Sequence, residues 1–143
     1  MHTIKIAKID PNAYIPTRKN PSDAGLDIYA NQSFTIEPHS FAIVSTGITV
    51  EIEDGFFGLL KPKGRSNHLL GAGVVDAGYQ GEILVKVVNI ADDPLEINPG
   101  YAIAQLLIIP IFTPAVIEVS VGQIHKDDSS RGGTGGIVDQ FNL

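Results

Sequence analysis

The 143-residue sequence contains no cysteine, so it can form no disulfide, no thiolate metal site and no thiol nucleophile. Basic residues are also scarce: 10 Lys and Arg stand against 16 Asp and Glu, which gives a formal net charge of −6. This balance argues against general affinity for nucleic acid, which favours a basic surface. It still leaves room for a small basic pocket.

Long apolar runs are absent as well. The longest run, AIAQLLIIPIF, is interrupted by Gln105 and Pro110 and is far too short to span a bilayer as a helix. The N-terminal segment MHTIKIAKID has no long apolar core, so we expect no signal peptide. We therefore expect a cytoplasmic protein that binds neither membranes nor nucleic acid.

What the sequence does contain is a series of short apolar segments rich in β-branched residues. Residue types alternate along residues 3–8 and 48–52, and this period of two predicts strands with one buried face. Gly, Pro, Asn and Asp interrupt the chain every ~8–12 residues, a spacing typical of all-β sandwiches and barrels. We predict a single all-β domain over residues 1–125, a barrel or jelly roll, with at most one short helix near residues 67–73.

Composition changes near His125, where the segment HKDDSSRGGTGGIVDQFNL begins with a polar, glycine-rich half. Such a segment buries little apolar surface on its own. It is consistent with a frayed terminus or with a flexible arm, residues 126–143, that becomes ordered over a ligand. Arg131 between glycines suits contact with phosphate, because guanidinium and bare backbone amides both favour anions.

A basic stretch, KPKGRSN, ends in a hydroxyl and an amide. Lys61, Lys63 and Arg65 are spaced so that an extended backbone places all three on one face. Together with Ser66 and Asn67 they suit a polyphosphate. An edge strand protected by lysines explains the same spacing equally well.

Two further polar features have both a structural and a functional explanation. Asp23 and Asp27, in DAGLD, can cap a turn or hold Mg²⁺ or its waters. Gln105 lies within an otherwise apolar strand, where it can simply face outward or contact a ligand.

The segment GAGVVDAGYQGE places one carboxylate, Asp76, between an apolar run and a tight turn. Its residues and EILVKVVN predict two strands joined as a hairpin. Residues 83, 85, 87 and 89 of the second strand then share one face, which Asn89 closes. A buried amide needs partners, so Asn89 is either an interior hydrogen-bonding device or a ligand contact. Tyr79 at the turn can present its ring to a sugar or base.

Taken in order, DAGLD, GRSN, GAGVVDAGYQGE, PGYAIAQL and SSRGGTGG resemble the five motifs of the trimeric dUTPase family. One such motif is weak, but all of them in this order, over about residues 23–136, form a specific signal. The resemblance implies a jelly-roll-like distorted β-barrel that assembles as a homotrimer, with active sites at subunit interfaces. It implies hydrolysis of dUTP to dUMP and pyrophosphate, with Mg²⁺ on the triphosphate.

The resemblance also implies roles for residues of the third motif. Asp76 matches the catalytic aspartate that orients the attacking water, whose proton it would accept during attack on the α-phosphorus. Tyr79 matches the ring that packs on deoxyribose. Asn89 matches the uracil reader, together with backbone groups at Gly73 and Val75.

The other matches concern the triphosphate and its metal. The implied triphosphate ligands and neighbouring substrate contacts are Arg65, Ser66, Asn67, Gln105 and Arg131, the last on the γ-phosphate. Asp27 matches the residue that holds Mg²⁺ indirectly, through water.

The sequence departs from the family pattern in three places. In the fifth motif Gly136 takes the place of an aromatic residue, so we expect the arm to close differently. Tyr101 stands where an acidic residue is common, and Asn67 and His68 replace a small or apolar pair.

Two other functions fit parts of the pattern. A dCTP deaminase, alone or combined with dUTPase activity, shares the GRSN and hairpin motifs, but needs a glutamate where Lys86 stands. A non-catalytic, nucleotide-binding regulatory homologue would explain the altered fifth motif. The intact Asp76, Arg65 and Gln105 argue against such a pure binder.

Overall fold

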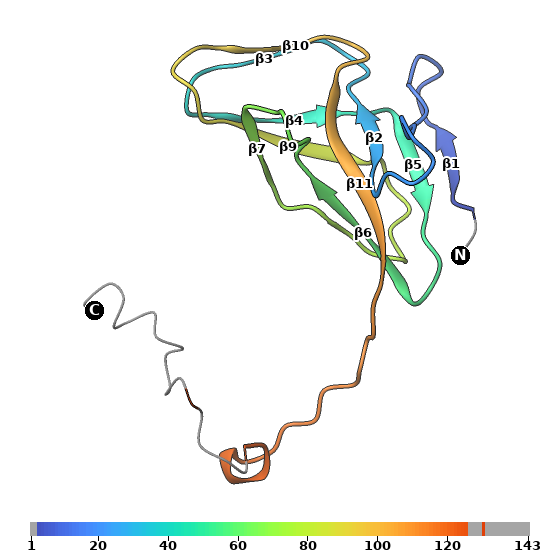
Figure 1. The fold of residues 1–143 in the computed structure, drawn as a ribbon, viewed down its shortest axis with the longest axis vertical. Coiled ribbons are helices and arrows are strands. Elements are labelled where there is room, and N and C mark those ends of the chain that lie inside the picture. The colour runs from blue at the N-terminus through green and yellow to red at the C-terminus, as the bar shows by residue number, and fades with distance from the viewer. Residues whose placement is uncertain (1–2, 126–129, 131–143) are drawn as a thin grey trace. The chain divides into compact units, whose positions relative to one another are not determined.

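The computed structural model describes residues 3–125 and 130, and the secondary structure of this part is almost entirely β (Figure 1), which confirms the all-β prediction. None of its helices is long and apolar enough to cross a membrane. The strands are β1 (Lys5–Lys8), β2 (Leu26–Tyr29), β3 (Phe34–Ile36), β4 (Phe41–Ser45), β5 (Ile48–Glu51), β6 (Phe56–Lys61), β7 (His68–Gly71), β8 (Val74–Val75), β9 (Leu84–Asn89), β10 (Leu95–Ile97) and β11 (Ala102–Pro110).

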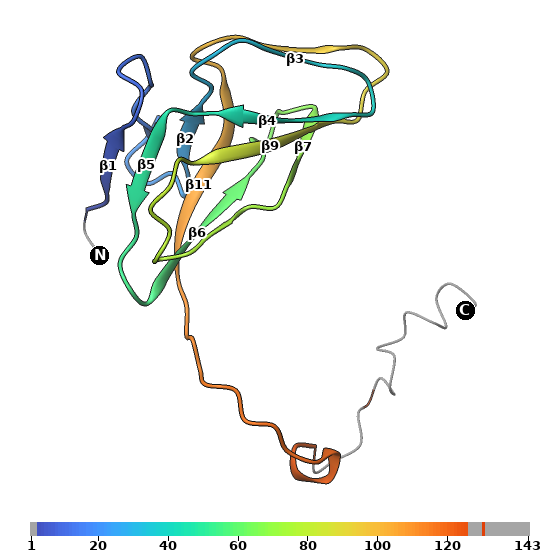
Figure 2. The same ribbon diagram turned by 180° about the vertical axis from the view of Figure 1, so that it is seen from behind.

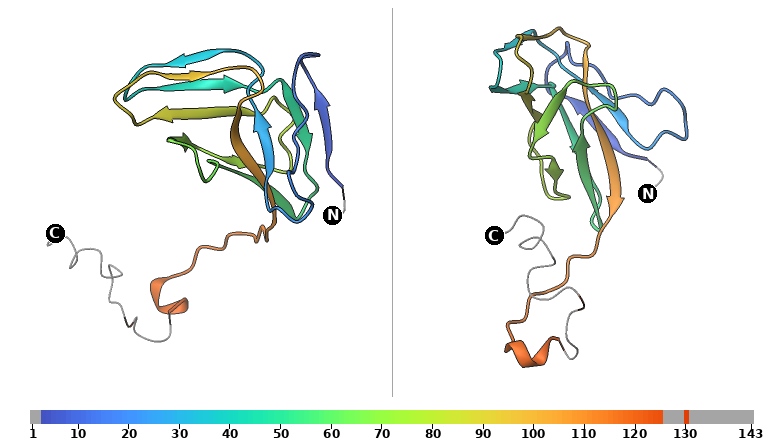
Figure 3. Two further views of the ribbon diagram at one scale, coloured as in Figure 1. Left: turned by 45° about the horizontal axis from the view of Figure 1, so that its top comes forward. Right: turned by 60° about the vertical axis from the view of Figure 1, so that its left-hand side comes forward.

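The strands form two larger antiparallel sheets and two strand pairs. One sheet has the order β2-β11-β6-β8 and the other the order β4-β9-β7, while β1 pairs with β5 and β3 with β10. β11 runs steeply across the direction of β4 and β9 (Figures 1 and 3). The β3–β10 pair lies on the side of β4 that faces away from β9, and the β1–β5 pair lies beside β2. The view from behind shows the same arrangement (Figure 2). Together these strands wrap around one core.

The core follows the predicted alternation of side chains. Along β9 and the residue before it, positions 83, 85, 87 and 89 are buried, whereas Leu84 and Lys86 are exposed. Burial of such apolar side chains from both sheets supplies the main stabilising free energy of the barrel. The largest buried apolar side chains are Ile28, Ile36, Ile48, Ile83, Ile97, Ile103 and Leu106.

The helix expected near residues 67–73 is not formed, because this segment is strand β7. β7 pairs with β9 from His68 opposite Asn89 to Gly71 opposite Lys86. His68 is buried and Leu69 exposed, which is the alternation of a strand. The helical element in the described residues is a short 3-10 helix, Val121–Gln123.

The hairpin predicted between residues 73–76 and 82–89 is also wrong in its pairing. β8 pairs with β6, in the other sheet, while β9 pairs with β7 and β4. Residues 72–83 are therefore a long excursion between β7 and β9. It begins at Ala72 and Gly73, whose φ angles of 60° and 141° turn the backbone away from β7.

The chain divides into two compact units, residues 1–112 and 113–143. All the strands that the structure describes belong to the first unit. In the second, residues 113–125 are exposed and carry the 3-10 helix, whose N-terminus is capped by reciprocal hydrogen bonds between Ser120 and Gln123. Apart from Ser130, the predicted arm, residues 126–143, lies outside the described residues, so its boundary and Arg131 stay predictions.

Candidate active site

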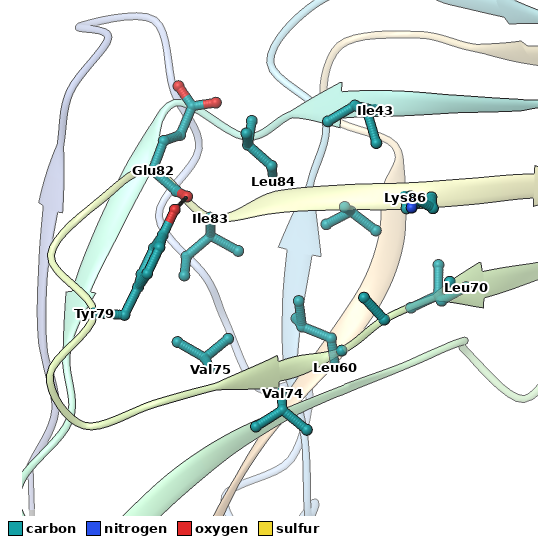
Figure 4. A pocket seen from close by; sticks show the side chains of 14 residues that line it. Ile43, Leu60, Leu70, Val74, Val75, Tyr79, Glu82, Ile83, Leu84 and Lys86 are labelled. Atoms are coloured by element: carbon teal, nitrogen blue, oxygen red, sulfur yellow. Dashed lines mark hydrogen bonds between the residues drawn. The ribbon is translucent and has the colours of Figure 1, made fainter.

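An apolar cavity of about 440 Å³ lies between β7, β8 and β9. Its volume falls within the ~300–1,000 Å³ common for small-molecule sites. Figure 4 shows Val75 and Ile83 pointing toward one another, with Tyr79 at one end of the cavity and Leu70 and Lys86 at the other. The excursion between β7 and β9 opens this space, because β8 is held against β6 instead of closing against β9.

Bare backbone forms part of the cavity wall. A Cβ atom on Gly71 would lie 2.7 Å from Lys86 Cδ, and one on Gly73 would lie 2.8 Å from the Leu60 carbonyl oxygen. The Leu60 amide donates a 2.7 Å hydrogen bond to the carbonyl of Gly73. Glycine is therefore required at both positions for the close packing of the backbone against Lys86 and Leu60.

Asp76 and Tyr79 lie in the turn that follows β8. Val75 is buried and lines the cavity, and the next residue, Asp76, is exposed and is not among the residues that line it. The Tyr79 amide donates to the Asp76 carbonyl at 3.1 Å, which closes the turn. The Tyr79 hydroxyl donates to the Glu82 carbonyl at 2.6 Å and so holds the ring against the cavity (Figure 4).

A second, polar cluster forms where β2, β11 and β6 run side by side. Gln105 on β11 is the register partner of Asp27 on one side and of Lys61 on the other. Its side-chain amide donates to the Pro62 carbonyl at 3.0 Å. Lys63 forms an ion pair with Asp27, and both side chains are largely buried. The first and fourth motifs thus lie side by side, and both contact residues 62–63, which directly precede the second motif.

The basic stretch after β6 is a turn and not a continuous stripe. β6 ends at Lys61, and the Ser66 amide donates to the Lys63 carbonyl at 3.0 Å. Pro62 and Gly64 explain this ending, because proline lacks a ladder donor and glycine favours a turn. β6 is an inner strand, so the alternative of a lysine-protected edge does not apply. Arg65 and Asn67 are exposed and Ser66 is half-buried.

The two aspartates of DAGLD have separate environments. Asp23 caps a turn, because its carboxylate accepts a 3.0 Å hydrogen bond from the Asn20 amide. Asp27 lies beside Lys63 and Gln105. Within residues 3–125 no three His, Cys, Asp or Glu side chains group as a metal site. Mg²⁺ in nucleotide sites needs only one or two carboxylates besides the substrate phosphates and water. Asp27 alone fits that role, although its carboxylate already forms an ion pair with Lys63.

Asn89 does not line the cavity. It is 2% exposed, and its side-chain amide donates to the carbonyls of Ile36 at 3.0 Å and Asp93 at 2.8 Å. Its side-chain oxygen accepts from the Ala91 amide at 3.0 Å. These bonds fit the interior hydrogen-bonding alternative, and the contact between Asn89 and uracil stays a prediction.

Some cavity residues carried no recognisable signal in the sequence. Leu60, Leu70 and Ile43 are ordinary strand residues whose side chains line the cavity only because three separate strands meet there. Lys86 was noted only as a misfit to the deaminase pattern, yet it lines the cavity with its ammonium 5.3 Å from the centre of the Phe41 ring.

The chain is similar to known proteins over most of its length. A family model described as dUTPase matches residues 11–137. The deoxyuridine 5'-triphosphate nucleotidohydrolase of Mycolicibacterium gilvum is 35% identical over 141 residues, covering 93% of this chain and 92% of the relative. That of a Picosynechococcus species is 32% identical over 142 residues, covering 95% and 96%.

Solved structures give the same result. A dUTPase of Staphylococcus bacteriophage 80alpha, solved with dUPNHPP, aligns with a TM-score of 0.82 at 26% identity, covering 94% of this chain and 96% of that one. A mutant dUTPase from phage phi11 of S. aureus aligns with a TM-score of 0.77 at 27% identity, covering 82% and 97%. The latter structure is described as showing how a structural Mg(II) ion is coordinated.

The fold is thus a jelly-roll-like β fold of the kind found in nucleotide hydrolases, as predicted. Because the family model and the relatives cover nearly the whole chain, the chain belongs to the dUTPase family, and its activity is that of a dUTP diphosphatase.

Proposed function

We propose that the chain hydrolyses dUTP to dUMP and pyrophosphate through a water that Asp76 orients toward the α-phosphorus, with Mg²⁺ on the triphosphate. One observation carries this proposal: β8 ends beside an apolar cavity of about 440 Å³, with Val75 in its wall and Asp76, the next residue, exposed. A carboxylate within hydrogen-bond reach of a water can accept its proton during attack on phosphorus.

In this proposal the cavity selects deoxyuridine over other nucleosides. Main-chain groups near Gly71 and Gly73 would pair with the uracil edge, and cytosine would leave some of them unpaired. The Tyr79 ring, fixed through Glu82, would pack on deoxyribose and oppose a 2′-hydroxyl.

The polar cluster and the turn after β6 would bind the triphosphate. Arg65 suits bidentate contact with phosphate oxygens, while Ser66, Asn67 and Gln105 add neutral donors. Arg131 would contact the γ-phosphate. The chemistry that Mg²⁺ supplies when bound is neutralisation of phosphoryl charge. Asp27 would hold the waters of that ion, and Lys63 would keep this carboxylate in place.

The two clusters support a site shared between subunits. β6 and β8 are antiparallel, with Gly58 opposite Val75, so Asp76 follows opposite Phe57. Lys61 lies four residues further along β6, roughly 13 Å away at ~3.3 Å per residue. We therefore propose a homotrimer in which Asp76 and Arg65 of one site come from different chains. The cytoplasmic location and the lack of affinity for membranes and nucleic acid stay predictions.

Replacement of Asp76 by Asn tests the proposed chemistry. Asp76→Asn keeps the size of the side chain but removes its basicity, so dUTP hydrolysis should slow by roughly 10²–10⁴-fold. Binding of a non-hydrolysable dUTP analogue should change little. Pyrophosphate release and calorimetric titration measure the two quantities. Unchanged turnover in Asp76→Asn would contradict the proposal.

Assays of the wild-type chain separate the other two functions. Release of ammonia from dCTP would show a deaminase, and binding of dUTP without release of pyrophosphate would show a regulatory binder. We expect neither result.

A further inference from the structure

A buried histidine connects the end of the turn that carries Arg65 and Ser66 to strand β11 of the other sheet. His68 is the first residue of β7, two residues after Ser66, and it is 2% exposed. Its Nε2 atom hydrogen-bonds the carbonyl oxygen of Ile103 at 3.0 Å. β7 belongs to the β4-β9-β7 sheet and Ile103 to β11 of the other sheet, so this bond joins the two sheets.

Ile103 is the extra residue of a β-bulge. Ala102 lies opposite Tyr29, and Ala104 lies opposite Ile28, so two steps along β11 match one step along β2. On the other side of β11, the pairing with β6 begins only at Gln105. A bulge interrupts the regular ladder of hydrogen bonds. The backbone at Ile103 therefore depends on a group outside the ladder, and His68 supplies it.

The position of this bulge decides where Gln105 lies. Gln105 follows Ile103 by two residues and lies opposite both Asp27 and Lys61. A strand that slips by one residue turns each side chain to the other face of its sheet. The hydrogen bond from His68 thus opposes a slip that would remove Gln105 from the polar cluster. At its other end, His68 fixes the exit of the turn that carries Arg65 and Ser66.

Filling space does not by itself explain an imidazole here. The Nδ1 atom of His68 is buried and has no hydrogen-bond partner within the described part of the chain. An apolar side chain of similar volume would avoid that desolvation cost. The bond to a carbonyl requires the proton on Nε2, which leaves the lone pair on Nδ1. What the imidazole contributes beyond packing is therefore this one directed donor.

We propose that His68 is a positioning residue for triphosphate binding: through the Ile103 carbonyl it sets the register of Gln105 relative to Arg65 and Ser66. This inference rests on the proposed function, because it assumes that these residues bind the triphosphate. It does not involve the cavity residues near Tyr79.

The test compares three variants, His68→Leu, His68→Asn and His68→Gln. Gln carries an amide donor at about the reach of Nε2, whereas Asn is too short and Leu has no donor. The dissociation constants of a non-hydrolysable dUTP analogue and of dUMP are measured for each. We expect His68→Leu and His68→Asn to weaken binding of the analogue roughly tenfold and binding of dUMP less than about twofold. His68→Gln should restore most of the affinity for the analogue.

His39 provides the matched control. It is an exposed histidine whose Nε2 bonds Asp92 at 2.8 Å, remote in the sequence from every motif. His39→Asn and His39→Gln should leave both dissociation constants unchanged. If His68→Leu lost equal affinity for the analogue and for dUMP, or lost no affinity for either, the inference would be overturned.

Two measurements keep the inference testable if His68→Leu and His68→Asn do not fold. Nitrogen NMR of histidine-labelled wild-type protein should show His68 with its proton on Nε2, and a proton on Nδ1 alone would overturn the inference. Arg65→Ala and Gln105→Ala are measured in parallel. If they leave analogue affinity intact, the proposed triphosphate site fails. If they weaken it while His68→Gln and the other His68 variants do not, only the positioning role fails.

Discussion

At the scale of single residues, one buried amide ties together separate segments of the barrel. Asn89, at the end of β9, donates to the carbonyls of Ile36 and Glu37, at the end of β3, and to that of Asp93, before β10. A buried polar group with all its hydrogen bonds made stabilises a unique arrangement of the chain around it. These bonds predict a contribution of Asn89 to the stability of the fold.

We therefore expect Asn89→Ala to lower the free energy of unfolding by about 1–3 kcal/mol, because it leaves buried carbonyls without a donor. The KM for dUTP should stay the same at temperatures where the variant is folded. Asn98→Ala, at an exposed position, is the matched control and should change neither quantity. Denaturant unfolding and steady-state kinetics give the two readouts. A large rise in KM with unchanged stability would restore Asn89 as a ligand.

At the scale of elements, the excursion between β7 and β9 creates the site. β7 and β9 pair directly, yet the chain between them crosses to β6, forms β8 and returns. The turn away from β7 uses left-handed backbone at Ala72 and a positive φ at Gly73. This geometry both opens the cavity and brings bare backbone into its wall.

Gly73→Ala should disturb that element. A Cβ atom would meet the Leu60 carbonyl oxygen at 2.8 Å, and the φ of 141° is strained for any side chain. We expect a loss of roughly 1–3 kcal/mol of unfolding free energy and weaker binding of deoxyuridine. Gly78→Ala in the same excursion meets nothing within 4 Å and should be neutral or stabilising by ~0.4–1 kcal/mol. Equal stability changes in the two variants would contradict this description.

Alternation and turn residues were enough to place most strands of the barrel. They marked which side chains of residues 83–89 face inward, because a buried face imposes a period of two. They did not reveal strand partners, because the same alternation suits any neighbour. Hence the sequence alone predicts a pairing of β8 with β9 and allows a helical turn at β7, whose HLLG segment lies between polar and glycine residues.

The sequence predicts which residues belong to the candidate site more readily than how they are arranged. The motifs predict Asp27, Gln105 and Arg65 as site residues, and the register places Asp27 and Gln105 side by side, whereas the stretch before Arg65 is a turn and not the expected extended strand. The Lys63–Asp27 ion pair and the His68 bond escaped notice because both join residues more than 30 apart in the sequence. No local pattern encodes such contacts.

At the scale of the whole molecule, the separation between the polar cluster around Gln105 and Asp76 is the central feature. The outer face of the β4-β9-β7 sheet also carries exposed apolar side chains: Phe41, Ile43, Leu69 and Leu84. Exposed apolar patches of this kind mark association surfaces. Both features support an assembly in which neighbouring chains complete each other's sites.

Subunit mixing tests this assembly. Asp76→Asn and Arg65→Ala should each be nearly inactive alone, but mixed trimers should regain activity, because some sites combine an intact Asp76 with an intact Arg65 from another chain. Sedimentation should give three times the 15.3 kDa subunit mass. A mass equal to one subunit, or inactive mixed assemblies, would contradict the shared site.

The most direct measurement is a crystal structure with a non-hydrolysable deoxyuridine triphosphate analogue and Mg²⁺. The account predicts the base in the cavity between β7, β8 and β9, and an ordered water between the Asp76 carboxylate and the α-phosphorus, roughly 3–3.5 Å from that atom. An Asp76 side chain turned away from the analogue, with no ordered water between them, would contradict it.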